Sequence, residues 1–340
     1  MGFKVANTLA LPGVDFGEEL LQPFNAEVVR GMWVTEEEII AHAMDADAII
    51  GDVSHQPFTR PLLSELKQCR VIAGIGIGYD TTDVQAATDL GIVVTNVPDY
   101  CLDEVSGLAL TFMLALGHRL FPVDRAVHER RPLFTVDRKA LADIAPIFRM
   151  RGQTLGIIGL GKIGTTLALK TRGLGMRVIA YDPYVLGPVM QSRGVEQMDL
   201  ETLLAESDFI SLHTPLTAET RGMIGYDQFA RMKRTCYFIN TSRGGCVEQS
   251  GLVRALREGL IAGAGIDVTA DEPLSPDNPL LAMPNVILTG HIAWYSVTSD
   301  MELYRKPVTQ VIEVLKGKWP VYAVNPEARS RWVDRWGNKG

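Results

Sequence analysis

Cysteine is scarce in this sequence, and its spacing excludes the usual metal-binding and redox arrangements. Four cysteines occur among 340 residues, at positions 69, 101, 236 and 246. None of them forms a C-x-x-C pair, and no combination of histidine and cysteine has the spacing of a zinc site. We therefore expect that the thiols are reduced, that no metal is bound and that no cysteine is catalytic.

Long basic runs and long apolar runs are also missing. The net charge is −7 and the basic residues are not clustered, which argues against general nucleic-acid binding. The first residues, MGFKVANTLALPGVDFGEE, show neither the basic start nor the apolar stretch of a signal peptide. We expect a cytoplasmic protein without a membrane segment. The length favours two domains.

Residues 155–182, LGIIGLGKIGTTLALKTRGLGMRVIAYD, have the pattern of a dinucleotide-binding unit. An apolar strand over 155–158 leads into a G-x-G-x-x-G at 159–164. A helical pattern over 165–172 and a second strand over 176–181 follow, and Asp182 closes the segment. This strand–turn–helix context, with an acid at the right distance, is what the motif requires. The alternative is a glycine-rich turn that binds nothing.

Each part of this motif has a physical role. Gly159 permits the tight turn, Gly161 lets a pyrophosphate approach the backbone, and Gly164 lets the helix pack close to the sheet. The helix N-terminus offers N–H groups to the phosphates. Asp182 would accept hydrogen bonds from the ribose hydroxyls and repel a 2′-phosphate, which favours NAD over NADP.

Strands and helices alternate on both sides of this unit, which predicts an α/β fold. In the first hundred residues we expect strands at 3–7, 46–51, 70–75 and 92–95. Further strands are expected at 208–213, 236–240, 263–268 and 286–289, so about six strands between 155 and 289 would form a doubly wound sheet. Helices are expected at 99–119, 249–258 and 299–317. The tail over 319–340 should pack loosely or cap the first domain.

Three residues at or just beyond strand ends suit the reduction of a 2-keto acid. His291 could give a proton to the carbonyl oxygen, since histidine titrates near neutral pH. Glu272 would hold the imidazole in one tautomer. Arg243 could bind a carboxylate and polarise a carbonyl. Singly, each has another explanation: a surface arginine, a loop acid or a core histidine.

The glycines in residues 74–80, GIGIGYD, follow a predicted strand. Glycines there permit unusual backbone conformations and expose N–H groups, which can form a nest for an anion such as a carboxylate. The segment alone is equally compatible with an ordinary tight turn.

Together these segments resemble the D-isomer-specific 2-hydroxyacid dehydrogenases, over about residues 45–318. The resemblance rests on seven segments in order: GIGIGYDTTDV (74–84), VTNVPDY (94–100), LGIIGLGKIG (155–164), LHTPLTAET (212–220), INTSRGG (239–245), GIDVTADEP (265–273) and TGHIAW (289–294). It implies a Rossmann cofactor domain over 103–295. It also implies a smaller, flavodoxin-like substrate domain built from 1–102 and 296–340.

The same resemblance implies residue roles. Arg243, Glu272 and His291 would be catalytic, with Arg243 also binding substrate. The substrate carboxylate would meet the backbone N–H groups of Ile77 and Gly78, with Tyr79 and Trp294 near the pocket. The implied cofactor-binding residues are Val105, Gly159, Leu160, Gly161, Lys162, Ile163, Gly164, Asp182, His213, Thr214, Pro215, Thr220, Thr241 and Asp267.

Finer expectations also follow. DYCLDEV, YDPY and HIAWYS resemble the C-terminal-binding-protein branch, in which Trp294 would favour an apolar or aromatic keto acid. The family implies a homodimer, formed through the arm over 121–151. Alternatives are a phosphoglycerate, hydroxypyruvate or glyoxylate type of member, or an NAD(H)-sensing corepressor-like binding protein with incidental activity. The particular acid, the direction of reaction and the redox behaviour of Cys246 stay open.

Overall fold

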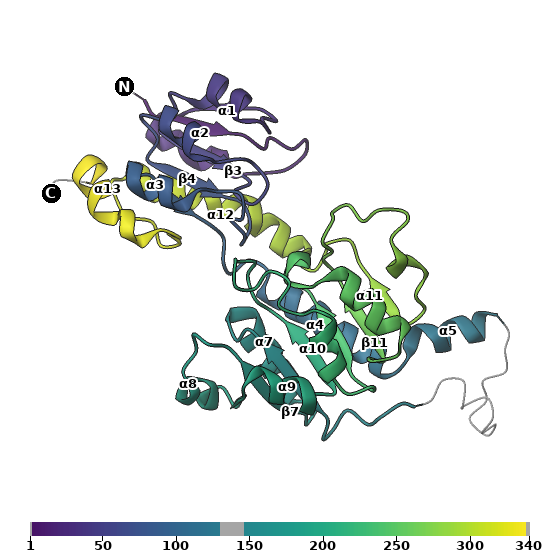
Figure 1. The fold of residues 1–340 in the computed structure, drawn as a ribbon. Coiled ribbons are helices and arrows are strands. Elements are labelled where there is room, and N and C mark those ends of the chain that lie inside the picture. Colours follow the sequence, from purple (N-terminus) through teal and green to yellow (C-terminus); the bar gives the residue numbers. More distant parts are fainter. Residues whose placement is uncertain (1, 130–145, 338–340) are drawn as a thin grey trace. The chain divides into compact units, whose positions relative to one another are not determined.

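The computed structural model describes residues 2–129 and 146–337. The chain forms two compact units, one of Met1–Cys101 with Ser296–Gly340 and the other of Leu102–Tyr295 (Figure 1). Each unit contains one wholly parallel sheet with helices around it, so the predicted α/β class with a doubly wound sheet is confirmed.

The first unit has a five-stranded sheet in the order β2-β1-β3-β4-β5, the flavodoxin-like order. Its strands are β1 (Lys4–Asn7), β2 (Glu27–Arg30), β3 (Ala48–Gly51), β4 (Val71–Gly74) and β5 (Val93–Thr95). Two of the three interior strands, β3 and β4, are buried along their whole length, as in a parallel sheet covered on both faces.

Helices from both ends of the chain cover this sheet. They are η1 (Glu18–Phe24), α1 (Glu36–Ala43), α2 (Arg60–Glu65), α3 (Val84–Leu90), α12 (Val297–Leu315), η4 (Pro326–Ala328) and α13 (Arg329–Trp336). In Figure 1 the yellow-green α12 runs against the purple and blue elements of this unit, in agreement with its contacts to β3 and β4. Thr35 caps α1 in a full capping box with Glu38.

The second unit has a seven-stranded sheet in the order β12-β11-β10-β9-β6-β7-β8. Its strands are β6 (Thr154–Ile158), β7 (Arg177–Tyr181), β8 (Glu196–Gln197), β9 (Phe209–Leu212), β10 (Tyr237–Asn240), β11 (Gly263–Ile266) and β12 (Val286–Leu288). The order reverses between β6 and β9, and ligands of such sheets bind at the carboxyl ends of the strands beside that point.

The helices of the second unit pack on both faces of its sheet. They are α4 (Leu102–Gly117), α5 (Leu120–His128), α7 (Lys162–Arg172), α8 (Gly187–Ser192), α9 (Leu200–Glu206), α10 (Tyr226–Arg231), η2 (Gly244–Cys246), α11 (Gln249–Arg257) and η3 (Pro279–Ala282). Two apolar clusters result, one around Phe229 and Phe238 and the other around Phe112 and Phe209.

Most predicted strands and helices appear within a few residues of their expected bounds, and two strands were missed. β2 and β8 are short edge strands: β2 (EVVR) has only two apolar residues, both half-buried, and β8 (EQ) has none. The sequence therefore carried no continuous apolar run to mark them.

The C-terminal tail packs firmly on the first unit. Trp332 in α13 is fully buried, and its Nε1 donates to Arg70 O at 2.9 Å. Asn325 Oδ1 accepts from Val94 N at 2.9 Å, and its Nδ2 donates to Ile92 O at 2.9 Å, so the tail adds to the edge strand β5. The prediction that the tail caps the first domain is therefore right, and the alternative prediction that it packs loosely is wrong.

Part of the predicted arm, residues 130–145, lies outside the described residues. Within residues 2–129 and 146–337, no single helix is both long and apolar enough to cross a membrane. Only α4 and α5 taken together, as a pair bent by 59°, have the required length and composition.

Candidate active site

The glycine turn between β6 and α7 has the shape that dinucleotide binding needs. Gly159 has φ +91°, and a Cβ there would lie 2.8 Å from His213 O. A Cβ on Gly164 would lie 2.4 Å from Gly159 O, so no larger residue fits. A Cβ on Gly161 would meet no atom within 4 Å, which leaves the backbone open to a ligand at the start of α7. Lys162 and Ile163 form the first turn of that helix.

Asp182 follows β7 and lies directly beside this turn. Its Oδ2 accepts from Leu160 N at 2.8 Å and its Oδ1 accepts from Tyr184 N at 2.9 Å. Two backbone N–H groups therefore fix the carboxylate at the position where the motif requires a ribose-binding acid.

Two buried polar atoms at the neighbouring strand ends lack partners. Among the described residues, neither Nδ1 of His213, after β9, nor Oγ1 of Thr241, after β10, makes a hydrogen bond. Nε2 of His213 lies 2.9 Å from Ser211 Oγ, and burial lowers the pKa of His213 to about 4, so its ring is neutral. Buried polar atoms are normally satisfied, so this pair fits a site that receives a polar ligand.

The loop after β9 is ordered by its own side chains. Thr220 Oγ1 donates to Pro215 O at 2.6 Å and accepts from Thr217 N at 2.8 Å. Thr214 Oγ1 lies 3.7 Å from the buried Sγ of Cys246. Val105, in the first turns of α4, is 5% exposed.

Asp267, after β11, organises the loop that carries His291. Its Oδ1 accepts from Thr289 Oγ1 at 2.5 Å and from Ile292 N at 3.0 Å, and its Oδ2 accepts from Ala293 N at 3.1 Å. Its own carbonyl accepts from His291 N at 2.8 Å. The carboxylate is 2% exposed and is thus a structural anchor of that loop.

The structure brings His291 and Glu272 into direct contact. Nδ1 of His291 lies 2.7 Å from Oε2 of Glu272, while Thr269 N donates to Oε1 at 3.1 Å. Burial of Glu272 opposes ionisation, but the bond and charge of His291, the Thr269 N–H and the charge of Arg243 outweigh it and lower the pKa of the carboxyl group. His291 has φ +56°, an uncommon conformation for a residue other than glycine.

Arg243 stands on a loop that packs against the Glu272 loop. A Cβ on Gly244 would lie 1.9 Å from Thr269 O, so the two loops touch through their backbones. Asn240 braces the arginine: its Oδ1 accepts from Ser242 N at 3.0 Å, and its Nδ2 donates to Arg243 O at 3.1 Å. The three predicted catalytic residues therefore gather at one edge of the sheet.

The predicted carboxylate nest lies in the first unit, after β4. Gly76 has φ +90°, and its carbonyl accepts from Val97 N at 2.7 Å. The carbonyl of Ile77 accepts from Asn96 Nδ2 at 2.8 Å, which holds the turn. Gly78 is partly exposed and Tyr79 is 44% exposed.

Trp294 is in the second unit, three residues beyond His291. It packs edge-on against Tyr295 with ring centroids 5.5 Å apart.

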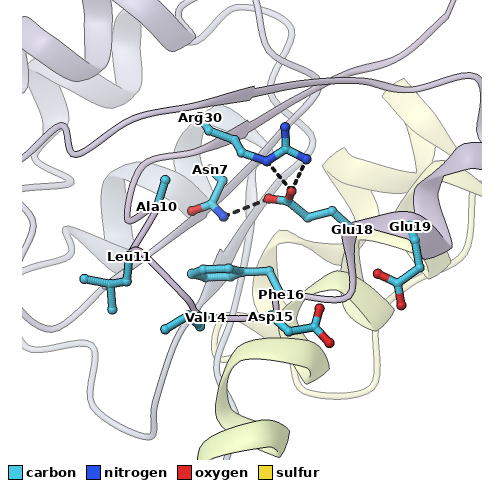
Figure 2. A pocket seen from close by; sticks show the side chains of 9 residues that line it. All are labelled: Asn7, Ala10, Leu11, Val14, Asp15, Phe16, Glu18, Glu19 and Arg30. Atoms are coloured by element: carbon cyan, nitrogen blue, oxygen red, sulfur yellow. Dashed lines mark hydrogen bonds and ion pairs between the residues drawn. The ribbon is translucent and has the colours of Figure 1, made fainter.

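A separate cavity of about 360 Å³ lies in the first unit beside the ends of β1 and β2 (Figure 2). Its charged side chains are already paired with protein groups. Glu18 accepts from Asn7 Nδ2 at 2.8 Å and binds Arg30, as the dashed lines in Figure 2 show. Asp15 and Glu19 both bind Arg305. This arrangement stabilises the fold locally and holds none of the predicted site residues.

Two supporting residues escaped the sequence analysis. Asn240 was visible only as part of INTSRGG. Arg193 follows α8 and donates to Leu160 O at 2.9 Å and to Thr165 Oγ1 at 2.8 Å, so it braces the glycine turn. No local pattern marks Arg193, because its partners are about thirty residues away in the chain.

The fold and this site together define a dinucleotide-binding oxidoreductase, and similarity to known proteins narrows the class. The model of the D-isomer specific 2-hydroxyacid dehydrogenase NAD-binding domain matches residues 110–293. The chain belongs to the D-isomer-specific 2-hydroxyacid dehydrogenase family, whose members are NAD-dependent dehydrogenases or 2-keto acid reductases.

Several relatives are similar over most of the chain. A glyoxylate reductase of Korarchaeum cryptofilum is 38% identical over 86% of this chain and 87% of its own length. A hydroxypyruvate reductase of Blautia hydrogenotrophica is 35% identical over 85% of this chain and 88% of its own length. A D-3-phosphoglycerate dehydrogenase of Archaeoglobus fulgidus is 35% identical over 96% of this chain, which spans only 59% of that protein.

A solved structure agrees with these relatives. The D-lactate dehydrogenase of Aquifex aeolicus, complexed with NAD and lactic acid, superposes with a TM-score of 0.78 at 29% identity and covers 92% of this chain and 96% of its own. The predicted family is therefore right. The finer prediction of the C-terminal-binding-protein branch is not supported, because the relatives point to glyoxylate reductases and phosphoglycerate dehydrogenases instead.

Proposed function

We propose that this protein is an NAD(H)-dependent reductase of short 2-keto acids, of the glyoxylate or hydroxypyruvate type. The observation that carries the proposal is the 2.7 Å contact between His291 and Glu272, at the sheet edge that also holds Arg243. The names of the glyoxylate and hydroxypyruvate reductases among the relatives support the short substrate.

The second unit supplies the proton chemistry. Glu272 engages Nδ1 of His291, so Nε2 is the nitrogen that would give a proton to the carbonyl oxygen of the substrate. The carboxylate fixes the tautomer and stabilises the protonated imidazole. Arg243 would bind the substrate and polarise its carbonyl group. NADH, when bound, supplies the hydride.

The residues at the glycine turn fit NAD. We assign the dinucleotide to the turn over 159–164 and the N-terminus of α7, with Asp182 on the ribose hydroxyls. The partnerless His213 Nδ1 and Thr241 Oγ1 are assigned to its polar groups. The remaining residues of this assignment are Val105, Thr214, Pro215, Thr220 and Asp267. Because the fixed carboxylate of Asp182 would repel a 2′-phosphate, we propose selectivity against NADP.

We assign the carboxylate of the substrate to the glycine turn after β4. The N–H groups of Ile77 and Gly78, in the turn opened by Gly76, form an anion-binding nest that carries no charge of its own. Tyr79 flanks this turn and is half exposed.

We also propose a homodimer that uses the arm around α5. Leu120, Phe121 and Val127 of this helix are 55%, 51% and 59% exposed, so a second copy could bury them. Residues 130–145 of the same arm lie outside the described part of the chain.

The test is NADH oxidation by the purified protein with glyoxylate, hydroxypyruvate, pyruvate, 4-methyl-2-oxopentanoate and phenylpyruvate. We expect turnover that favours the two shortest polar acids and falls about 10²–10⁴-fold in His291→Ala. His118→Ala, an exposed histidine of the same unit, is the matched control. Tight NADH binding without turnover of any acid would overturn the proposal. A preference for phenylpyruvate would instead favour the aromatic pocket expected around Trp294.

A further inference from the structure

One hydrogen bond joins two exposed loops of the second unit. The hydroxyl group of Tyr184 donates to Oε2 of Glu219 at 2.7 Å. Tyr184 belongs to the loop between β7 and α8, and Glu219 belongs to the loop after β9. Tyr184 is 80% exposed and Glu219 is exposed as well, so neither side chain contributes to the apolar core.

The bond connects the loops on either side of the carboxyl end of β6. In the seven-stranded sheet, β6 lies between β7 and β9. Neighbouring strands are about 4.8 Å apart, so the two loops start about 10 Å from each other, with the end of β6 between them. β6 runs directly into the glycine turn over 159–164. The Tyr184–Glu219 bond therefore links the two loops that flank this turn.

Both loops carry groups that we assign to the adenosine half of the dinucleotide. NADP has its extra phosphate on the adenosine ribose, so Asp182, the acid that selects against it, marks that half of the site. The backbone N–H of Tyr184 donates to Oδ1 of Asp182 at 2.9 Å. Glu219 directly precedes Thr220, whose hydroxyl group orders its loop. The proposed catalytic pair follows β11 and β12, towards the opposite edge of the sheet.

The bond can open without a large loss of stability. Both side chains are exposed, so the hydroxyl group and the carboxylate can each bond to water when they separate. The hydrogen bond to Glu219 raises the pKa of Tyr184, so the hydroxyl group keeps the proton that it donates. The two loops can therefore be joined in one state and separate in another.

We propose that Tyr184 and Glu219 form a clasp that closes over the adenosine half of NAD(H) and opens each time the cofactor enters or leaves. This inference rests on the proposed function, because it places the dinucleotide on the glycine turn with its adenosine ribose on Asp182. The clasp closes over the empty site and over the filled site alike. It therefore slows both association and dissociation and leaves the affinity nearly unchanged.

The test measures the association and dissociation rate constants of NADH by stopped-flow fluorescence. Tyr184→Phe keeps the ring and removes the hydroxyl group, so both rate constants should rise about three- to tenfold, the effect of one lost hydrogen bond, while Kd stays within twofold of the wild type. Glu219→Gln keeps an oxygen that can accept from the hydroxyl group, so its rate constants should lie between those of the wild type and Tyr184→Phe. The double variant should exchange NADH no faster than Tyr184→Phe, because the bond is already absent.

Tyr226→Phe is the matched control. Tyr226 Oη donates to Oε2 of Glu258 at 2.5 Å, which is the same kind of bond in the same unit, but it joins α10 to the end of α11. Its loss should leave both NADH rate constants as they are in the wild type. ADP-ribose has the adenosine and lacks the nicotinamide. In competition with NADH, its rate constants should rise in Tyr184→Phe by the same factor as those of NADH.

Three outcomes would overturn the clasp while NADH binding and reductase activity stand. They are NADH rate constants that do not change in Tyr184→Phe, a rise in Kd that comes from dissociation alone, and an equal rise of the rate constants in Tyr226→Phe. Rate constants of ADP-ribose that stay unchanged in Tyr184→Phe would also contradict the placement over the adenosine. A wild-type protein that binds neither NADH nor ADP-ribose would overturn the proposed function itself, and the clasp with it.

Discussion

Nδ1 of His291 and Oε2 of Glu272 lie 2.7 Å apart, although the two residues belong to different loops. Glu272 comes from the loop after β11 and His291 from the loop after β12, and these strands are neighbours in the sheet. The left-handed backbone of His291 is held by the bond from its N–H to Asp267 O. The imidazole is therefore fixed at both its backbone and its ring.

Glu272→Gln should lower kcat for keto acid reduction about ten- to a hundredfold. The amide can still accept from Nδ1, but it lacks the charge that stabilises the protonated ring, and bonds to charged groups contribute about 1.5–3 kcal/mol. Steady-state kinetics measures the change. NADH binding, followed by fluorescence, should stay the same, and Asp271→Asn, an exposed neighbouring acid, serves as control. A kcat within twofold of the wild type would show that the pair has no catalytic role.

The Glu272–His291 pair should also persist in mildly acid solution. The pKa of Glu272 is held below its usual value of 4.5, so the carboxylate is ionised above that pH, and the pair is lost only as the pH falls through the lowered pKa. An NMR titration of labelled glutamate checks this. Protonation of Glu272 at or above pH 4.5 would contradict it.

Asp182→Ser should relax cofactor selectivity. Serine keeps a hydrogen-bonding group but removes the negative charge beside the ribose, so the ratio of kcat/KM for NADPH to that for NADH should rise tenfold or more. Asp227→Asn removes an exposed acid of the same unit and should leave this ratio as it is. Equal selectivity in Asp182→Ser and the wild type would locate the discrimination elsewhere.

Stability should depend on pH through His213. Burial lowers its folded-state pKa from 6.5 to about 4, so the unfolded chain binds a proton more readily, and stability is lost as the pH falls from about 6.5 towards 4. From pH 8 to pH 5, protonation of this histidine in the unfolded chain should lower the free energy of unfolding by about 2 kcal/mol. Urea unfolding of wild type and His213→Gln measures the difference in slope. His118→Ala should keep the wild-type slope, whereas equal slopes in all three proteins would contradict the prediction.

Trp332→Ala should destabilise the first unit by about 3–5 kcal/mol, because it removes a fully buried aromatic ring and one of the two hydrogen bonds that Arg70 O accepts. Hydrogen exchange should quicken in β4 and β5, beside which the tail packs. Val333→Ala changes the next residue, which is 43% exposed, and should cost less than 1 kcal/mol. A tail that could be removed without loss of stability would refute this assignment.

The buried strands and the glycine turn could be predicted from the sequence, because each depends on residues that are close together in the chain. Strands buried on both faces appear as continuous apolar runs, and the glycine turn keeps its spacing because Gly159 and Gly164 admit no side chain. Edge strands β2 and β8 escaped prediction because solvent-facing residues remove that apolar run. Arg193 and Asn240 were not predicted because each donates to a backbone carbonyl, which a residue of any type supplies.

The α/β class, the dinucleotide turn and the residue types of the candidate active site could be predicted from the amino-acid sequence, since all of these follow from periodicity and short motifs. Which side chains meet could be seen only in the folded protein. It paired Glu272 with His291 and assigned both oxygens of Asp267 to the His291 loop. It also buried Trp332 against residues more than two hundred positions away. These contacts depend on the parallel strand order, which brings the carboxyl ends of distant segments to one edge, and no local pattern encodes that order.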